Sequence, residues 1–203
     1  MIERLSLVQL DALREIGTIG AGRAATALAD LIGTKVEIDV PQVRILPIEN
    51  VSSILGDPER MFFVLDMELL GEIRGRIFLL FSPEHAKVLS ASLLGKKSDE
   101  IRFDDEMVQS TLKESANILS GSFLTALVEM TNINIMSSVP LLAMDMIGAV
   151  LDFIFIQIAQ YTQEVFFIKT DMKVTDVNLE GFFLLFPQDE SLRKILSALG
   201  VRE

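Results

Sequence analysis

The sequence contains no cysteine and a single histidine, His85, among its 203 residues. It therefore has no disulfide framework, no thiolate nucleophile and no cysteine- or histidine-based zinc site. Cationic residues are also few, because 18 lysines and arginines stand against 29 aspartates and glutamates, and the formal net charge is -11. A surface of this sign repels phosphate backbones and anionic lipid head groups. We therefore expect neither nucleic acid nor a membrane surface as a partner.

The N-terminal residues lack the long apolar stretch and the small-residue cleavage site of a secretion signal, so we expect a cytoplasmic protein. The segment Leu141–Gln160 is almost continuously apolar and about as long as a membrane span. It carries Asp145 and Asp152, and a charge near the middle of a span is costly. A buried helix or strand is therefore favoured over membrane insertion.

Hydrophobic residues make up 50% of the chain, which is long enough for one well-buried domain over residues 1–203. An internal repeat divides this domain into halves 1–97 and 106–203. A shift of 99 residues aligns Glu15–Ile19 with Glu114–Ile118 and Thr26–Leu28 with Thr125–Leu127. A shift of 105 aligns Leu79–Phe81 with Leu184–Phe186. Ordered matches of Glu, Thr and Ala are unexpected by chance even in so apolar a chain.

Each half has the same predicted order of elements: a long helix, a strand, two further strands and a short amphipathic helix. The first strands are predicted at Val36–Val40 and Ile133–Val139, each ended by a proline. The short helices are predicted at Pro83–Leu94 and Glu190–Leu199. This order predicts an α+β fold with a largely antiparallel sheet, two equivalent long helices packed on it and a pseudo-twofold axis between the halves.

A polar stripe follows one face of each predicted long helix. In the second half it consists of Ser110, Glu114 and Asn117, spaced so that all three lie on one face. The first half has Asp11, Glu15 and Thr18 at the same spacing. A solvated helix face is the ordinary explanation of such a stripe, but its recurrence at equivalent positions of a repeat favours a functional one.

The stripes and the repeat resemble the CheC/FliY/CheX family of chemotaxis phosphatases, most closely the CheC branch. The family signature is Asp or Ser, three residues, Glu, two residues and Asn. Asp11 to Gly22 resembles the first copy of the signature and Ser110 to Gly121 the second. The resemblance covers nearly the whole chain. FliY proteins carry a further flagellar-switch domain, for which no residues are expected here, so a structural role in the flagellar switch is disfavoured.

The resemblance implies hydrolysis of the aspartyl phosphate of the response regulator CheY. It implies that Asn117 positions the attacking water and that Glu114 docks the partner by pairing with a lysine of its active site. The Mg²⁺ would belong to the phosphorylated partner, so the chain itself needs no metal or other cofactor. Thr18 departs from the signature, because one short hydroxyl cannot make the two-ended contact of a carboxamide. We expect Glu15 and Thr18 to form a degenerate first site that can dock but not catalyse.

Three further features have alternative interpretations. Gly17, Gly20 and Gly22 resemble a phosphate-binding loop, but they lie within a predicted helix, so close helix packing is favoured. His85 is expected on the surface. The resemblance implies that Asp145 lies in the surface that docks the receptor deamidase CheD, and an ordinary exposed aspartate is the alternative interpretation. A non-catalytic module that sequesters CheD or CheY is the alternative to the enzyme.

Overall fold

The computed structural model describes residues 7–158, 164–174 and 177–199. The helices are α1 (Leu7–Ile32), α2 (Val51–Leu55), α3 (Pro83–Leu94), α4 (Glu106–Thr131), α5 (Ile147–Ile158) and α6 (Asp189–Ala198). The strands are β1 (Val36–Pro47), β2 (Met61–Gly71), β3 (Gly75–Phe81), β4 (Ile135–Ser137), β5 (Leu141–Met146), β6 (Glu164–Val174) and β7 (Val177–Pro187). Short 3₁₀ turns lie at Ile48–Asn50 and Ser98–Glu100.

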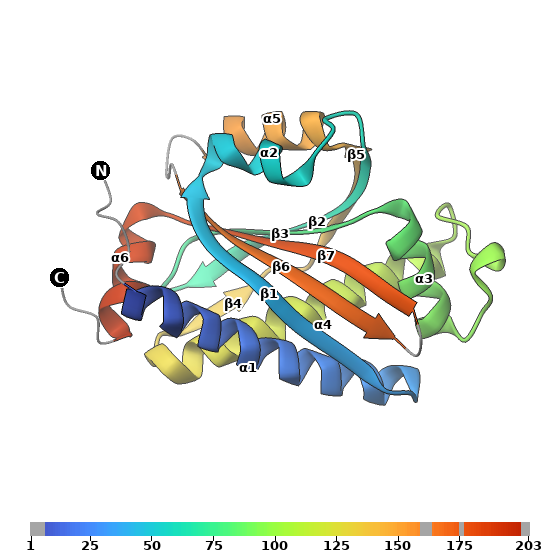
Figure 1. The fold of residues 1–203 in the computed structure, drawn as a ribbon, viewed down its shortest axis with the longest axis horizontal. Helices are drawn as coiled ribbons and strands as arrows, with labels where there is room; N and C mark the ends of the chain where they lie inside the picture. The colour runs from blue at the N-terminus through green and yellow to red at the C-terminus, as the bar shows by residue number, and fades with distance from the viewer. Residues whose placement is uncertain (1–6, 159–163, 175–176, 200–203) are drawn as a thin grey trace.

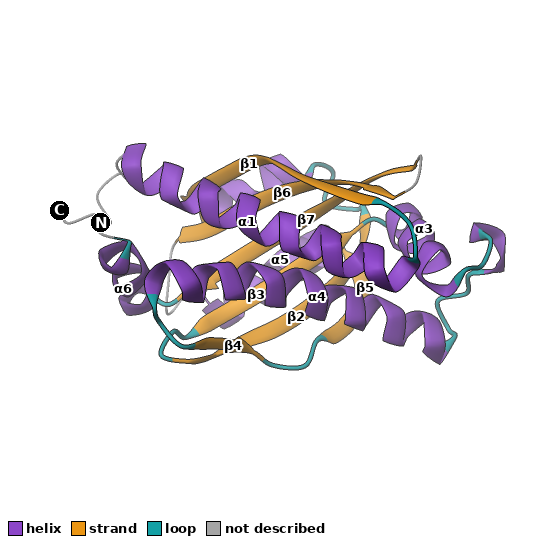
Figure 2. Ribbon diagram, turned by 90° about the horizontal axis from the view of Figure 1, so that it is seen from below, coloured by secondary structure: helices purple, strands orange, loops and turns teal. Residues whose placement is uncertain are grey.

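The strands form one antiparallel sheet in the order β1-β6-β7-β3-β2-β4, with β5 also paired to β2. Helices α1 and α4, each 26 residues long, lie side by side across one face of the sheet (Figures 1 and 2). Helices α2 and α5 cover part of the opposite face (Figure 1). The predicted α+β fold with an antiparallel sheet and two long helices packed on it is confirmed.

Because helices cover both faces, the central strands are buried on both sides and have continuous apolar runs instead of alternating ones. Phe182–Phe186 of β7 and Ile77–Phe81 of β3 are buried throughout. Alternate residues of these strands belong to two separate cores. Leu79 and Phe183 face the core beneath α1 and α4, whereas Phe78 and Leu184 face the core beneath α2 and α5. Two cores in one small domain account for the high apolar content.

The order of elements is the same in the two halves, and the sheet has matching symmetry. Strands β3 and β7 pair at its centre, with Phe78 opposite Leu184 and Leu79 opposite Phe183. The shift of 105 residues found in the sequence exchanges these two pairs. The geometry agrees with a pseudo-twofold axis at this point, while the origin of the halves by duplication stays a prediction.

The predicted strand ends at the two prolines need correction. Strand β1 continues through Pro41 to Pro47, and its register with β6 shifts between Asp39 and Gln42. A proline cannot donate to the ladder, but β1 is an edge strand, where a local bulge accommodates it. In the second half the predicted strand Ile133–Val139 is reduced to β4, and β5 begins after Pro140. The two prolines occupy equivalent positions in the repeat. Pro41 lies at a register shift within β1, whereas Pro140 separates β4 from β5.

The segment Leu141–Gln160 is not buried throughout in its described part, and its residues 159 and 160 lie outside that part. It consists of β5 followed by α5. In the described residues, no helix is both long enough and apolar enough to cross a bilayer. Only one side of α5 packs on the sheet, and several apolar side chains of the segment are exposed: Leu141, Met144, Met146, Phe153 and Ile156.

Of the three glycines of α1, Gly20 serves the close helix packing favoured above. A Cβ built on Gly20 would lie 2.8 Å from the Cα of Phe123 in α4, so only a glycine lets the two helices approach this closely. A Cβ on Gly17 would lie 3.4 Å from Val40 of β1. Gly22, by contrast, faces open space. These residues lie within α1 and form no loop between a strand and a helix, so a nucleotide loop is excluded here.

His85 is half-buried, so its expected surface position was wrong in part. The backbone N–H of Glu180 donates to its Nδ1 at 3.1 Å, which ties α3 to β7. Ser82 caps the start of α3 by accepting the backbone N–H of His85.

Candidate functional site

The second polar stripe lies on the solvent side of α4. Asp105 caps this helix by accepting the backbone N–H of Met107 at 2.9 Å, and Asn132 ends it in the left-handed conformation. Between these caps, the side chains of Ser110, Glu114 and Asn117 are exposed, while the opposite face of α4 is buried against the sheet and α1. The helix thus presents the predicted residues outward.

Glu114 and Asn117 contact each other directly. The amide nitrogen of Asn117 donates to Oε2 of Glu114 at 3.3 Å. This contact fixes the direction of the carboxamide and leaves its oxygen without a partner among the described residues. An exposed carboxamide oxygen next to a carboxylate can accept a hydrogen bond from water, while the amide group can donate.

The first stripe lies on α1 and is organised differently. Asp11, Glu15 and Thr18 are exposed, as expected. The hydroxyl of Thr18 donates to the backbone carbonyl of Arg14 at 2.9 Å, and the guanidinium of Arg14 pairs with Asp11 at 3.3 Å. The donor of Thr18 is therefore used within its own helix, as is common for threonine in helices.

An ion pair that sequence reasoning missed joins the two helices. Arg23 of α1 donates two hydrogen bonds to Glu129 of α4, at 2.8 and 2.5 Å. The hydrogen bond with Arg23 and its positive charge lower the pKa of Glu129. The same hydrogen bond and the negative charge of Glu129 raise the pKa of Arg23. The partners are 106 residues apart, so no local pattern in the sequence signals their contact.

Asp145 lies on the opposite side of the sheet edge from this helix pair, in β5 at the start of α5. Its side chain is exposed and accepts the backbone N–H of Met146 at 2.8 Å. Met144 and Met146 beside it are also exposed, at 50% and 45%. The residue is therefore accessible to a partner, and it also satisfies a backbone donor next to α5.

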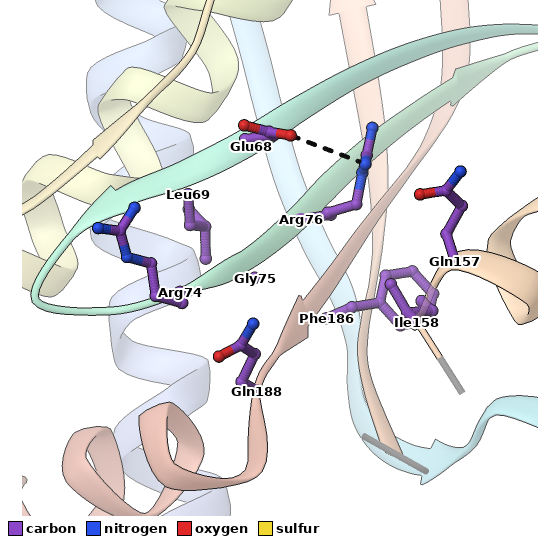
Figure 3. A pocket seen from close by; sticks show the side chains of 9 residues that line it. All are labelled: Glu68, Leu69, Arg74, Gly75, Arg76, Gln157, Ile158, Phe186 and Gln188. Carbon is purple, nitrogen blue, oxygen red and sulfur yellow. Dashed lines mark ion pairs between the residues drawn. The ribbon is translucent and has the colours of Figure 1, made fainter. Parts of the chain in front are cut away.

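A pocket of about 310 Å³ lies on the α5 side of the sheet and is also absent from the sequence predictions (Figure 3). Arg76 lines it, but its guanidinium pairs with Asp66 through Nε at 3.1 Å and lies 3.9 Å from Glu68. Arg74 and Gln188 also line it (Figure 3). The charges largely cancel, and none of the residues of either stripe lines this pocket.

No group of three or more aspartate, glutamate or histidine side chains is placed to hold a metal ion in the described residues. The first stripe instead presents two carboxylates, Asp11 and Glu15, and the second presents one, Glu114, all on the exposed faces of helices. Such surfaces suit contact with another macromolecule, which brings its own concave site, better than enclosure of a small molecule.

Comparison with known proteins identifies the family. The model of the CheC-like family matches residues 8–45, and that of the chemotaxis phosphatase CheX matches residues 64–150. The CheY-P phosphatase CheC of Bacillus subtilis is 30% identical over 196 residues, which cover 95% of this chain and 94% of that protein. The chain belongs to the CheC/FliY/CheX family of chemotaxis phosphatases.

Solved structures of the family have the same fold. FliY of Thermotoga maritima matches with a TM-score of 0.78 at 23% identity, over 98% of both chains. CheX in the CheX-CheY-BeF3-Mg complex of Borrelia burgdorferi matches with a TM-score of 0.51 at 18% identity, over 84% of this chain and 96% of that chain. The CheC-like match includes the first stripe, and the CheX match includes Glu114, Asn117 and Asp145.

Proposed function

We propose that this chain hydrolyses the aspartyl phosphate of the response regulator CheY at one working site on α4. The observation that carries this proposal is the contact between Asn117 and Glu114 on the exposed face of that helix. The similarity to known proteins supports the proposal, because the B. subtilis protein that matches 95% of the chain is a CheY-P phosphatase.

The chemistry requires little from the chain. An aspartyl phosphate is already activated, and phosphoryl transfer depends mainly on positioning and charge stabilisation. The oxygen of the Asn117 side chain accepts a hydrogen bond from a water and holds it in line with the phosphorus. The water oxygen bonds to phosphorus as the bond to the aspartyl oxygen breaks. The partner's carboxylate leaves as an anion, and both protons of the water end on the released phosphate.

Glu114 has a docking role in this proposal. Its carboxylate forms an ion pair with the lysine of the partner's active site and sets the register of α4. Its contact with Asn117 then couples docking to the orientation of the carboxamide. The Mg²⁺ held by the phosphorylated partner supplies charge neutralisation at the phosphoryl group.

We assign the first stripe a docking role without catalysis. Thr18 uses its hydroxyl within α1, and its side chain has no second polar group to place against the phosphoryl. Glu15 remains exposed and available for an ion pair. Because Thr18 stands where the second stripe has Asn117, only the second stripe carries a carboxamide, and we assign the activity to that stripe.

Phosphate release from phosphorylated CheY, with and without this protein, tests the proposed activity. CheY autodephosphorylates, so the protein at substoichiometric concentration should accelerate release over that background through many turnovers. Release at the background rate, with a folded protein and Mg²⁺ present, would exclude the enzyme.

A second function, docking of CheD, is favoured by an apolar edge formed by β4, β5 and α5. Large apolar side chains of these elements and of the β4–β5 connection are highly exposed, from 45% to 79%: Met136, Val139, Leu141, Met144, Met146, Phe153 and Ile156. Exposed apolar side chains that lie together mark interaction sites. Asp145 lies within this edge and could pair with a cationic group of CheD. We propose that this edge binds CheD while α4 acts on CheY, and that both partners are met in the cytoplasm.

A further inference from the structure

The two long helices carry few positive charges. Those of α1 have ion-pair partners, and that of α4 does not in the described part of the chain. The cationic residues of α1 are Arg14 and Arg23, and that of α4 is Lys113. Arg14 pairs with Asp11 and Arg23 pairs with Glu129. In the described part of the chain, no ion pair includes Lys113.

The repeat explains why Lys113 is left unpaired. The shift of 99 residues aligns Arg14 with Lys113 and Asp11 with Ser110. Each cation therefore directly precedes the glutamate of its stripe. In the first half an aspartate three residues earlier neutralises it, whereas a serine stands there in the second half and offers no charge.

Lys113 is placed to act with the Glu114–Asn117 pair. It lies four residues before Asn117, so the two side chains are neighbours on one side of the helix. Lys113 is half-buried. A lysine in this environment typically packs its apolar stem against the protein and keeps its ammonium in water. The ammonium can thus reach an anionic group that contacts Asn117.

We propose that Lys113 is a positioning residue, whose unpaired ammonium attracts the anionic phosphoryl group of the partner and steers α4 over it. This inference rests on the proposed function. A chain of net charge -11 repels an anionic substrate at long range. A cation beside Asn117 offsets this repulsion at the point where the phosphoryl group meets α4. The first stripe lacks such a cation, because Asp11 neutralises Arg14.

The test compares Lys113→Ala with its counterpart in the other half, Arg14→Ala. Lys113→Ala should lower kcat/KM for phosphorylated CheY about fivefold at low ionic strength, mainly through KM, because steering acts on encounter. The difference should shrink at high salt, where exposed charges are screened. Lys113→Arg should retain activity, and Arg14→Ala should match the parent protein. Equal salt dependence of kcat/KM in Lys113→Ala and the parent would overturn the proposal.

A binding measurement separates this inference from the proposed function. CheY carrying beryllium fluoride, an analogue of the phosphoryl group, is titrated with each variant. Lys113→Ala should weaken binding about fivefold and Arg14→Ala should leave it unchanged, even if no hydrolysis is seen and the enzyme is excluded. Equal affinity of Lys113→Ala and the parent, or no binding by the parent, would overturn the proposal, whatever the phosphatase assay shows. Unchanged thermal unfolding confirms that α4 is intact.

Discussion

In the proposed mechanism, a single residue at one position of each stripe decides whether that stripe is suited to catalysis. Asn117 and Thr18 occupy equivalent positions, are both exposed and each make one hydrogen bond. The bond of Asn117 is to the neighbouring Glu114 and leaves an oxygen facing solvent. The hydroxyl of Thr18 donates to the backbone carbonyl of Arg14, which uses its only side-chain donor. The substitution therefore changes both the reach and the availability of the polar group.

Introducing the missing carboxamide should activate the first stripe. In a protein whose second site is disabled by Asn117→Ala, Thr18→Asn should restore measurable hydrolysis of phosphorylated CheY, because Glu15 already stands three residues earlier. The measurement is phosphate release under multiple turnover. Thr18→Val is the matched control, because it removes the hydroxyl and adds no carboxamide, and it should restore nothing. Restoration by Thr18→Val would mean that carboxamide geometry is irrelevant.

At the scale of elements, the close approach of α1 and α4 holds both stripes in fixed positions on one surface. Gly20 permits the approach, and the Arg23–Glu129 pair connects the helices at the solvent side. Because exposed ion pairs contribute little, packing at Gly20 is the larger stabilising factor.

Gly20→Ala should therefore destabilise the protein despite the better helix propensity of alanine. Its Cβ would lie 2.8 Å from the backbone of Phe123, so the helices must separate. Overpacking of this kind costs about 1–3 kcal/mol, against a propensity gain of about 1 kcal/mol. Gly22→Ala is the control, since that position is open, and it should be neutral or stabilising. Urea unfolding of both variants measures the difference, and equal effects would contradict the packing role.

The link between the helices should depend on pH. Because Arg23 lowers the pKa of Glu129 in the folded state, the pair adds stability above the unfolded-state pKa of a glutamate, about 4.3, and loses it as the pH falls through the lower folded-state value. Glu129→Gln should thus melt slightly below the parent at neutral pH. The difference in Tm should vanish in acid, and a difference that grows in acid would contradict this.

The sequence predicted the long helices and the two hairpins, but not all elements between them. Asp105 marks the start of α4 as a cap, and the apolar runs around Leu79–Phe81 mark central strands. The five-residue helix α2 has too few residues for a periodic pattern. In α5 apolar residues cover both the packed and the exposed sides, so periodicity gives no signal for it. The residues of both stripes were found because they recur at one spacing.

At the scale of the whole molecule, the two halves are similar in fold and different in surface. The pseudo-symmetric counterpart of the β4–β5 edge is β1, which carries polar residues such as Glu37, Asp39 and Arg44. The β4–β5–α5 edge instead exposes apolar side chains. The sequence predicted an interface near Asp145 by resemblance. Its extent depends on the register of β2 with β4 and β5, which the sequence does not reveal.

Reversal of the charge at Asp145 should separate the two proposed functions. Asp145→Lys should abolish capture of CheD in a pull-down and leave hydrolysis of phosphorylated CheY unchanged, because α4 lies on the other face of the sheet. Glu190→Lys, an equal change of charge on exposed α6 and outside this edge, controls for net charge. Asp145→Asn preserves the acceptor for the Met146 N–H and tests the charge alone. Intact capture by Asp145→Lys would remove Asp145 from the docking surface.

The central claim is that one helix face, with Asn117 as its water-positioning residue, carries the activity of the whole molecule. Decay of phosphorylated CheY, measured side by side with Asn117→Ala and Thr18→Ala, tests it most directly. We predict that Asn117→Ala lowers the catalysed rate about 100-fold, because positioning of the water is lost, while Thr18→Ala retains the parent rate. Parent-level activity in Asn117→Ala, or a comparable loss in Thr18→Ala, would contradict the account.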